Sequence, residues 1–260
     1  MRKIIICMFL IIMVNVAKSQ DTMYVHMKVG GITKIAAANV DSIIFYQKVI
    51  TPPPPPTNTV TDIDGNVYHT IAIGTQTWMV ENLKTTKYRN GSSIPNVTSS
   101  ASWISLTTGA YCNYNNDATN AVLYGRLYNW YAASDSRNVA PVGWHVPTIA
   151  EFTTLANFLG GEGMAGISLK EAGTSHWGTN SGATNKSGFT ALPGGGRGGL
   201  TGNFGGIGVP VGNGYSGNWW STTQQTSANG QLMFIYDFQG MIHLSYWPMK
   251  DGYSIRCIKD

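Results

Sequence analysis

Five consecutive prolines, Pro52 to Pro56, divide this 260-residue chain into two parts that need not pack together. Proline fixes φ and favours the extended polyproline II helix, so the run predicts a stiff spacer about 15 Å long at ~3.1 Å per residue. We assign residues 51–59 to this proline-rich linker. The stretch that follows, 60–260, is long enough for one large domain with its own core.

The segment before the linker, residues 20–50, predicts a small β element. Gly30-Gly31 lies between apolar runs and indicates a hairpin turn. A third apolar run follows at Ile43-Ile44-Phe45. So short a segment cannot build a stable core alone, and we expect it to dock on another surface or to add a strand to one.

Residues 1–19 predict a signal peptide. Arg2 and Lys3 precede an apolar run from Ile4 to Val16, and Ala17-Lys18-Ser19 is a small-x-small cleavage site. A transmembrane anchor would need ~20 apolar residues, more than this run has. We therefore expect export to the cell surface, the periplasm or the extracellular space, with no membrane span in the mature chain.

Charge and composition exclude some partners. Cleavage would remove Arg2, Lys3 and Lys18 from the 17 basic residues, which leaves 14 against 13 acidic residues. Because no basic block remains, a nucleic-acid or anionic-membrane partner is not expected. The 31 glycines, 13 tyrosines and 8 tryptophans, with only 12% charged residues, are typical of a loop-rich exported domain.

Cys112 and Cys257 remain after cleavage. In an oxidising compartment a disulfide between them would close a loop of about 145 residues and stabilise the fold by roughly 4 to 5 kcal/mol in the chain-entropy model. Two buried free thiols are the alternative, because free cysteine is among the most buried residue types. The residues alone leave both interpretations open.

Local patterns predict an α+β domain with a few short helices, antiparallel strands and long Gly-rich loops. Asp64-Gly65 indicates a type I′ hairpin turn, which we prefer to a calcium loop over Asp62 to Asn66. Thr148 and Glu151 form a capping box ahead of a helix that ends at Gly160-Gly161.

Weaker patterns predict further elements. An apolar stripe from Tyr124 to Tyr131 indicates a helix, as does the stretch from Ile167 to Ala172. Strand alternation predicts that one member of Trp219-Trp220 is buried and the other exposed. The predicted C-terminal strands are Leu232 to Phe238, Met241 to Tyr246 and Tyr253 to Ile258.

Sequence motifs of catalytic sites are missing, or they lack the neighbouring helix or strand that such a site needs. Gly194, Gly196 and Gly199 satisfy G-x-G-x-x-G, but a Gly-rich loop follows where a dinucleotide site needs a helix. The histidines have no partner at metal-ligand spacing, and Ser216 is not in a G-x-S-x-G elbow. We expect a protein that is not an enzyme and has no cofactor and no metal.

Seven motifs, in this order along the chain, resemble those of one family. They are Thr61-Asp-Ile-Asp-Gly-Asn-Val-Tyr, Trp78-Met-Val-Glu-Asn-Leu-Lys, Tyr124-Gly-Arg-Leu-Tyr-Asn-Trp-Tyr, Gly143-Trp-His-Val-Pro-Thr, Leu169-Lys-Glu-Ala-Gly, Asn218-Trp-Trp-Ser and Tyr253-Ser-Ile-Arg-Cys. The family is the Fibrobacter succinogenes major paralogous domain (FISUMP) of secreted and surface bacterial proteins, and the resemblance covers residues 60–260. Residues 23–46 are similar to a short leader element of Bacteroidota surface proteins.

The resemblance implies a C-type-lectin-like fold and export, but no activity. The Pro147-Thr148 helix start and the Arg256-Cys257 ending also look like the formylglycine-generating-enzyme branch of that fold. Those enzymes hold copper with a cysteine pair near the C-terminus, and here only Cys257 lies near that end. The loops of calcium-dependent lectins are missing, so sugar binding does not follow from the fold.

These observations favour a non-enzymatic, adhesin-like binding module with a glycan or protein ligand at the cell surface. One alternative is a structural subunit of a surface assembly, whose N-terminal hairpin pairs with another chain by strand addition. The other alternative is an enzyme whose site the motifs do not reveal.

The candidate ligand site lies in the aromatic-rich C-terminal strands. Aromatic rings supply large, rigid contact areas, and loops and strand edges carry binding more often than core faces. Alternation turns Tyr246 away from Trp247 unless the strand ends before it. The hypothetical site combines Asp237 and His243 as polar specifiers with Tyr246, Trp247 and Trp219 as stacking surface and with Arg197.

Signal peptidase should release a mature chain that starts at Gln20. Intact-mass measurement of protein exported by a bacterial host checks this, because cleavage after Ser19 removes a defined mass. Exported protein that retains Met1 would contradict the predicted compartment.

Overall fold

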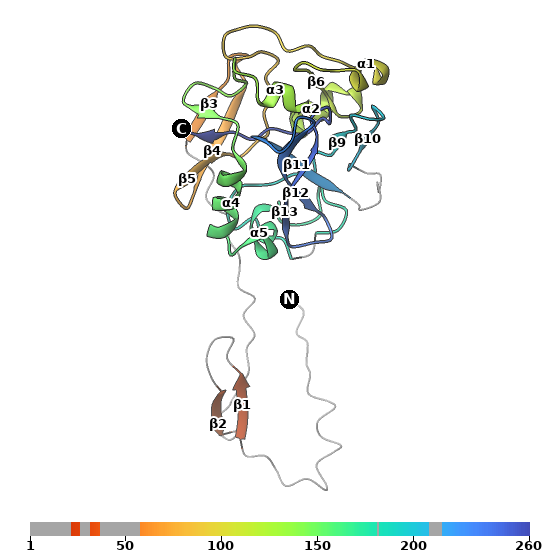
Figure 1. Cartoon of the computed structure of the whole chain (residues 1–260). Helices are drawn as coiled ribbons and strands as arrows, with labels where there is room; N and C mark the ends of the chain where they lie inside the picture. The colour runs from red at the N-terminus through yellow and green to blue at the C-terminus, as the bar shows by residue number, and fades with distance from the viewer. Residues whose placement is uncertain (1–21, 27–31, 37–57, 181, 208–214) are drawn as a thin grey trace. The chain divides into compact units, whose positions relative to one another are not determined.

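The computed structural model describes residues 22–26, 32–36, 58–180, 182–207 and 215–260 (Figure 1). The signal peptide, Gly30-Gly31, Ile43-Ile44-Phe45 and the proline run lie outside these ranges. The chain divides into two units, 1–49 and 50–260, and each is described by itself. In the first unit β1 (Thr22–His26) pairs antiparallel with β2 (Ile32–Ala36), which confirms the predicted strand pair.

The second unit is an α+β domain, as predicted, with short helices and antiparallel strands. Its helices are α1 (Ser100–Ile104), the 3-10 helix η2 (Tyr114–Asn116), α2 (Ala118–Tyr124), α3 (Trp130–Ala133), α4 (Ile149–Phe158) and α5 (Glu162–Leu169). Its strands are β3 (Asn58–Thr61), β4 (Val67–Ile73), β5 (Gln76–Met79), β6 (Tyr111–Cys112), β7 (Leu127–Tyr128), β8 (Trp144–His145), β9 (Gly196–Arg197), β10 (Phe204–Gly205), β11 (Ser216–Gln224), β12 (Asn229–Tyr236), β13 (Ile242–Pro248) and β14 (Ile258–Lys259). Within the described part of the chain, no helix has the length and apolar character needed to cross a bilayer.

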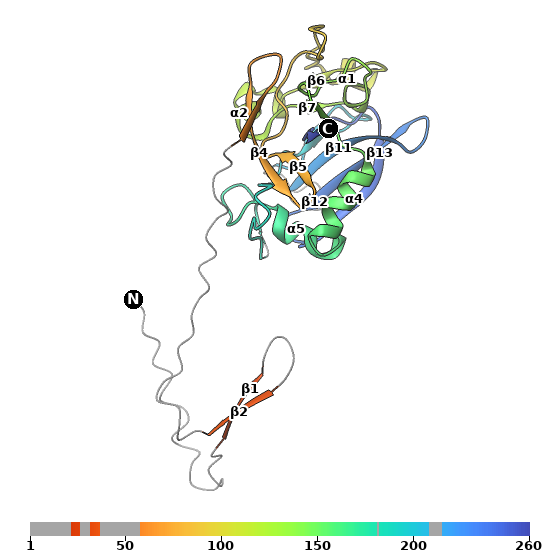
Figure 2. The same cartoon turned by 90° about the vertical axis from the view of Figure 1, so that its left-hand side faces the viewer.

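Two antiparallel sheets dominate the unit (Figures 1 and 2). One has the strand order β3-β4-β5-β14-β8, and the other the order β11-β12-β13. Two smaller pairs, β6 with β7 and β9 with β10, lie in the loop-rich part. Of the predicted last strand, only Ile258 falls in a regular strand, and Tyr253 and Ser254 form isolated bridges.

β3 and β4 form the hairpin predicted around Asp64-Gly65, but the turn is not type I′. The amide of Gly65 donates to the carbonyl of Asp62 at 3.0 Å, so the central residues are Ile63 and Asp64. The carboxylate of Asp62 accepts hydrogen bonds from the amides of Asp64 and Asn66, at 3.0 and 2.9 Å. This carboxylate therefore holds the turn itself.

The N-terminus of α4 is as predicted. The hydroxyl of Thr148 accepts a hydrogen bond from the amide of Glu151 at 3.3 Å, and the carboxylate of Glu151 accepts one from the amide of Thr148 at 2.7 Å. This reciprocal pair is the capping box. The apolar face of the helix buries Phe152, Leu155 and Ala156.

The helix predicted from Tyr124 to Tyr131 is wrong. α2 ends at Tyr124, because Gly125 takes a φ of +76°, which favours glycine. A Cβ on Gly125 would also lie 2.7 Å from the Cβ of Asn82. The chain then pairs as β7 with β6 before the short α3 begins.

The helix predicted from Ile167 to Ala172 lies earlier in the chain than predicted. α5 covers 162–169 and not the predicted 167–172, because Lys170 leaves the helix with a ψ of 145°. In that conformation its buried ammonium donates to the carbonyls of Asp237 and Gln239, both at 2.9 Å. Lys170 therefore anchors the connection between β12 and β13.

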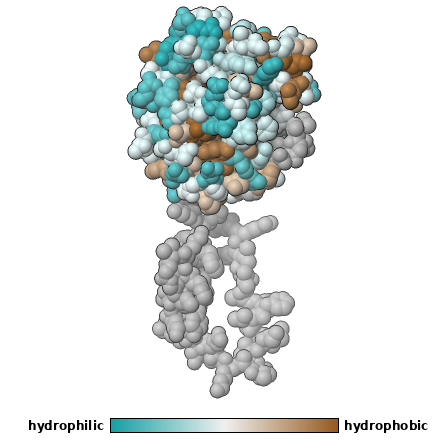
Figure 3. Space-filling view, viewed as in Figure 1, coloured by the Kyte–Doolittle hydropathy of each residue, from teal (hydrophilic) through white to brown (hydrophobic). Residues whose placement is uncertain are grey.

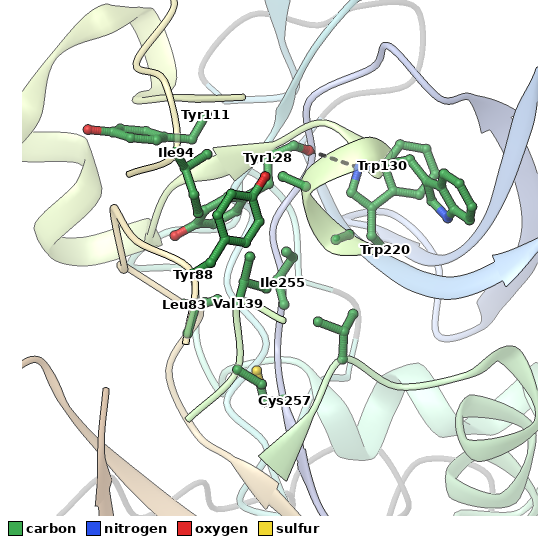
Figure 4. Close-up of a cluster of buried hydrophobic side chains, with 14 of the residues drawn as sticks. Leu83, Tyr88, Ile94, Tyr111, Tyr128, Trp130, Val139, Trp220, Ile255 and Cys257 are labelled. Atoms are coloured by element: carbon green, nitrogen blue, oxygen red, sulfur yellow. Dashed lines mark hydrogen bonds between the residues drawn. The ribbon is translucent and has the colours of Figure 1, made fainter. Parts of the chain in front are cut away.

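The sheet β11-β12-β13 has one core on each face, which decides where the tryptophan pair lies. Trp219 and Trp220 are both fully buried, so the prediction that one is exposed is wrong. Trp220 packs in a cluster with Tyr128 and Trp130, and its indole nitrogen donates to the carbonyl of Tyr128 at 2.9 Å (Figure 4). Trp219 packs on the opposite face, which α4 and α5 cover, in a cluster that includes Phe152.

A buried polar network lies on the Trp219 face. The side-chain oxygen of Asn82 accepts hydrogen bonds from the indole of Trp219 at 2.8 Å and from Arg256 Nε and Nη2 at 3.0 and 2.7 Å. Its nitrogen donates to the carbonyl of Tyr124 at 2.8 Å. Burial lowers the pKa of Arg256 to about 9, so the guanidinium keeps its charge at neutral pH.

The possible disulfide between Cys112 and Cys257 is wrong, since both are buried free thiols. Cys257 packs in the cluster around Trp220, whereas Cys112 packs in another cluster, with Trp103 and Tyr114. Burial raises the pKa of both thiols, to about 11 for Cys112. The alternative of two buried thiols is therefore the correct one.

His145 connects three parts of the second unit: β8, the start of α4 and the C-terminal residue. Its Nδ1 lies 2.7 Å from an Asp260 oxygen, and its Nε2 lies 2.8 Å from Glu151 Oε1. Partial burial lowers the pKa of His145, but hydrogen bonds to both carboxylates outweigh that and raise it overall. Burial raises the pKa of Glu151, but hydrogen bonds with Thr148 and His145 lower it overall.

Thr148→Ala should lower the free energy of unfolding by about 1 kcal/mol, because the amide at the start of α4 loses its acceptor. Urea denaturation measures the change. Thr153→Ala is the matched control, since that exposed hydroxyl only bonds the carbonyl of Ile149 within the same helix. Equal midpoints for the two variants would contradict the capping role.

His145→Gln should destabilise the domain most between about pH 4.5 and 6.5. The raised pKa of His145 gives stability that is full below its ordinary value of 6.5 and is lost as the pH rises through the folded value. The lowered pKa of Glu151 gives stability that is present above 4.5 and is lost on acidification. Urea midpoints of both proteins across this range test it, and a difference that does not change with pH would contradict the coupling.

Candidate ligand-binding surface

One face of the β11-β12-β13 sheet is only partly covered. The strand register places successive side chains on alternate faces, so residues that pair across the strands share a face. On this face Trp220 and Leu232 pack in the core cluster that contains Tyr128 and Trp130. The residues of the same face toward the start of β11 and the end of β12 are more exposed. We define the open face by Ser216, Asn218, Phe234, Tyr236, His243 and Trp247.

Aromatic rings on this face lie side by side, and we call them the aromatic strip. The centroid of Phe234 lies 4.6 Å from His243, 5.1 Å from Tyr236 and 6.5 Å from Trp247. Phe238, just beyond β12, stacks on Tyr236 at 5.4 Å. Phe234 is buried beneath the others, whereas Trp247 and Phe238 are 41% and 45% exposed.

The strip differs from the rest of the exposed apolar surface. Seen from the side shown in Figure 3, apolar side chains form small separate patches among polar ones. Scattered residues of this kind are normal on the surface of a folded domain. In the strip, Tyr236 contacts both Phe238 and His243, and Trp247 lies at the opposite edge of the buried Phe234, so accessible rings gather on one face.

A cavity of about 580 Å³ lies against the open face. Its floor includes Tyr236 and Trp247, and its wall is the Gly-rich segment that carries β9 and β10. The volume falls within the range of small-ligand pockets. The remaining lining residues are Gly196, Arg197, Gly198, Thr201, Asn203, Phe204, Gly205, Gly206, Ser216, Asn218 and Tyr253.

Arg197 builds the wall of this cavity from within. It is 1% exposed, and its guanidinium donates to the carbonyls of Gly202, Val97 and Thr98 at 3.0, 2.7 and 2.8 Å. The guanidinium also lies 4.7 Å from the ring of Trp103. These contacts make Arg197 a tether for the Gly-rich segment.

Tyr253 joins the wall to the core. Its ring lies 5.0 Å from Trp220, and its hydroxyl donates to Asp251 at 3.1 Å. A Cβ on Gly196 would lie 2.5 Å from this ring, so the wall approaches closely only because that position is glycine. The Asp251 carboxyl also accepts a hydrogen bond from the amide of Gly199. Burial raises the pKa of this carboxyl.

The structure brings only two of the six predicted site residues together. His243 and Trp247 share the open face, both in contact with Phe234. Burial lowers the pKa of His243, so the ring is neutral at neutral pH, and its Nε2 lies 2.8 Å from Gln239 Oε1. Tyr246 is 54% exposed, but strand alternation turns it to the opposite face, as we expected for a continuing strand.

The other three predicted residues do not reach the surface. Trp219 lies in the core under α4 and α5, and Arg197 is the tether described above. Asp237 is 6% exposed, and its carboxylate accepts hydrogen bonds from the amide and hydroxyl of Thr179 at 3.2 and 3.1 Å. Their polar groups serve the fold, because buried polar atoms need partners.

Sequence reasoning left Phe234, Tyr236 and Phe238 out of the site. Their alternation was visible, but the strand register that places Phe234 opposite His243 was not. Asn218 and Ser216 were also left out, because nothing local shows which face of β11 is open. Among the described residues, no group of three or more His, Cys, Asp or Glu side chains is placed to hold a metal ion.

Comparison with known proteins places the chain in a family. A family model described as the Fibrobacter succinogenes major domain matches residues 71–259. No curated protein and no solved structure matches the chain. Because the match covers well over half of the chain, including the β11-β12-β13 sheet and the candidate surface, the chain belongs to the Fibrobacter succinogenes major domain family.

Proposed function

We propose that this chain is an exported, adhesin-like binding module that holds its ligand on the aromatic strip and in the adjoining cavity. In this proposal the signal peptide directs export, and a C-type-lectin-like scaffold presents the surface. The mixture of short helices, antiparallel sheets and Gly-rich loops supports that scaffold. Binding without catalysis is the proposed role.

One observation carries the proposal: accessible rings gather around the buried Phe234 on one face of the sheet, beside a cavity. Trp247 and Tyr236 belong both to the strip and to the cavity lining. Large exposed rings are costly to leave in water, and a ligand that covers them gains contact area with little loss of side-chain entropy. The core beneath the sheet keeps these rings in position before a ligand arrives.

The charged groups nearest the cavity support binding over catalysis. The guanidinium of Arg197 donates hydrogen bonds to backbone carbonyls. The buried carboxylate of Asp251 accepts hydrogen bonds from the amide of Gly199 and the hydroxyl of Tyr253. A general acid or base must reach the reacting atom. In this arrangement both groups shape the wall.

Trp247→Ala should weaken binding about tenfold or more, since a stacking ring contributes on the order of 1 kcal/mol beyond its buried area. The mature chain is tested on glycan and protein arrays, and every hit is repeated by titration. Tyr246→Ala is the matched control, because the neighbouring aromatic residue is more exposed and lies on the other face. The control should bind within about twofold of wild type.

Urea midpoints of both variants show whether the fold is intact. The proposal fails if no array yields a ligand, or if every hit is equally strong for wild type and Trp247→Ala.

A further inference from the structure

We infer that the ligand is an uncharged, hydroxyl-rich glycan chain, lying along the aromatic strip with its polar edge in the cavity. This inference rests on the proposed binding function and specifies its ligand class. It follows from three properties of the surface: the neutral polar groups that line the cavity, the charged groups that already have protein partners, and the arrangement of the rings.

The polar side chains that line the cavity are neutral amides and hydroxyls. Asn218 is oriented by its nitrogen, which donates to the carbonyl of Gly195 and to Ser216 Oγ, both at 3.0 Å. On the opposite wall Thr201 and Asn203 are exposed, and the backbone amide of Asn203 donates to Thr201 Oγ1 at 3.2 Å. The side-chain amide of Asn203 has no hydrogen bond to another described residue. Amides and hydroxyls both donate and accept, which matches the hydroxyl groups of a sugar.

The charged groups around the cavity are already occupied. Arg197 is capped by three carbonyls, and the ammonium of Lys250 donates to the carbonyl of Ile104 at 2.9 Å. Asp251 is buried, with bonds from Gly199 and Tyr253. An anionic ligand gains most from charge-assisted hydrogen bonds. Among the described lining residues Arg197 is the one basic residue, and it is buried behind its carbonyl partners, so it offers such a ligand little.

The rings form a row and not an enclosed pocket. Successive centroids from Trp247 through Phe234 and Tyr236 to Phe238 are 6.5, 5.1 and 5.4 Å apart, and the buried Phe234 separates the accessible Trp247 from the accessible pair Tyr236 and Phe238. A sugar ring presents an apolar C–H face to an aromatic ring and directs its hydroxyls sideways. A row of rings beside neutral polar groups therefore suits several linked sugars, whereas a protein anchor would need a desolvated pocket.

The test uses the mature chain and named probes. Neutral polysaccharides (mixed-linkage β-glucan, xylan and galactomannan) are compared with the anionic polygalacturonate and chondroitin sulfate by affinity electrophoresis and titration calorimetry. At least one neutral polysaccharide should bind, with Trp247→Ala weakening it about tenfold. Added NaCl should leave this binding unchanged, because no ion pair is involved.

A pair of charge variants at one exposed position sharpens the test. Asn203→Asp and Asn203→Lys place opposite charges on the cavity wall, while Asn203→Ala removes the amide. For an uncharged glycan the two charged variants should agree within about threefold, because a neutral ligand does not distinguish their signs. Tighter binding by Asn203→Lys together with weaker binding by Asn203→Asp overturns the inference.

The outcomes separate this inference from the proposed function. Ring-dependent binding that is confined to polyanions, or to proteins on the arrays, overturns the glycan inference and leaves the binding module in place. If none of the three neutral polysaccharides binds but other ligands bind in a way that depends on Trp247, the glycan inference is likewise overturned and the proposed binding function stands. Loss of ring dependence for every probe overturns both.

Discussion

The side-chain amide of Asn82 joins chain segments that are far apart in sequence, and the candidate surface depends on it. Its oxygen accepts hydrogen bonds from Trp219 and Arg256, and its nitrogen donates to the carbonyl of Tyr124. All of these side-chain groups lie in the buried interior, where removing one partner costs the desolvation energy of the others. The rings of Phe189 and Trp219 also face the Arg256 guanidinium. Strand β11 is thereby held on one face through Trp219. On its other face Trp220 packs in a core, and only Ser216 and Asn218 line the cavity.

The two faces of the β11-β12-β13 sheet differ: one is covered by helices, and the other carries the candidate surface. Helices α4 and α5 cover the Trp219 face, and Lys170 and Arg197 tie the adjoining loops to backbone carbonyls. Such tethers hold loops in place where regular secondary structure is short. The open face can then present partly exposed rings such as Trp247 and Tyr236 and neutral polar groups such as Asn218. Rigid support below and accessible rings above are what a preorganised binding surface requires.

The motifs that resemble the family turn out to build the scaffold. Asn82, Arg256 and Trp219 come from three of them, and Glu151 lies just after a fourth. The aromatic strip lies outside all seven. The resemblance correctly predicted the family, whose model matches residues 71–259. Local signals such as the capping box at Thr148 could also be predicted, since they need no distant partner. It could not predict the site, because a ring's exposure depends on what packs above it.

The sequence by itself determined the elements whose causes are local: the α+β class, the β3–β4 hairpin, the start of α4 and the alternation of β12 and β13. It failed where a distant contact decides, as at Gly125, which lies against Asn82 and ends a helix that the apolar stripe would have continued. Only the tertiary structure decided that Cys112 and Cys257 belong to different cores. It also decided that Trp219 is core while Trp247 is surface. Composition and periodicity record which side chains are apolar, but burial is set by the segments that fold over them, and those segments come from elsewhere in the chain.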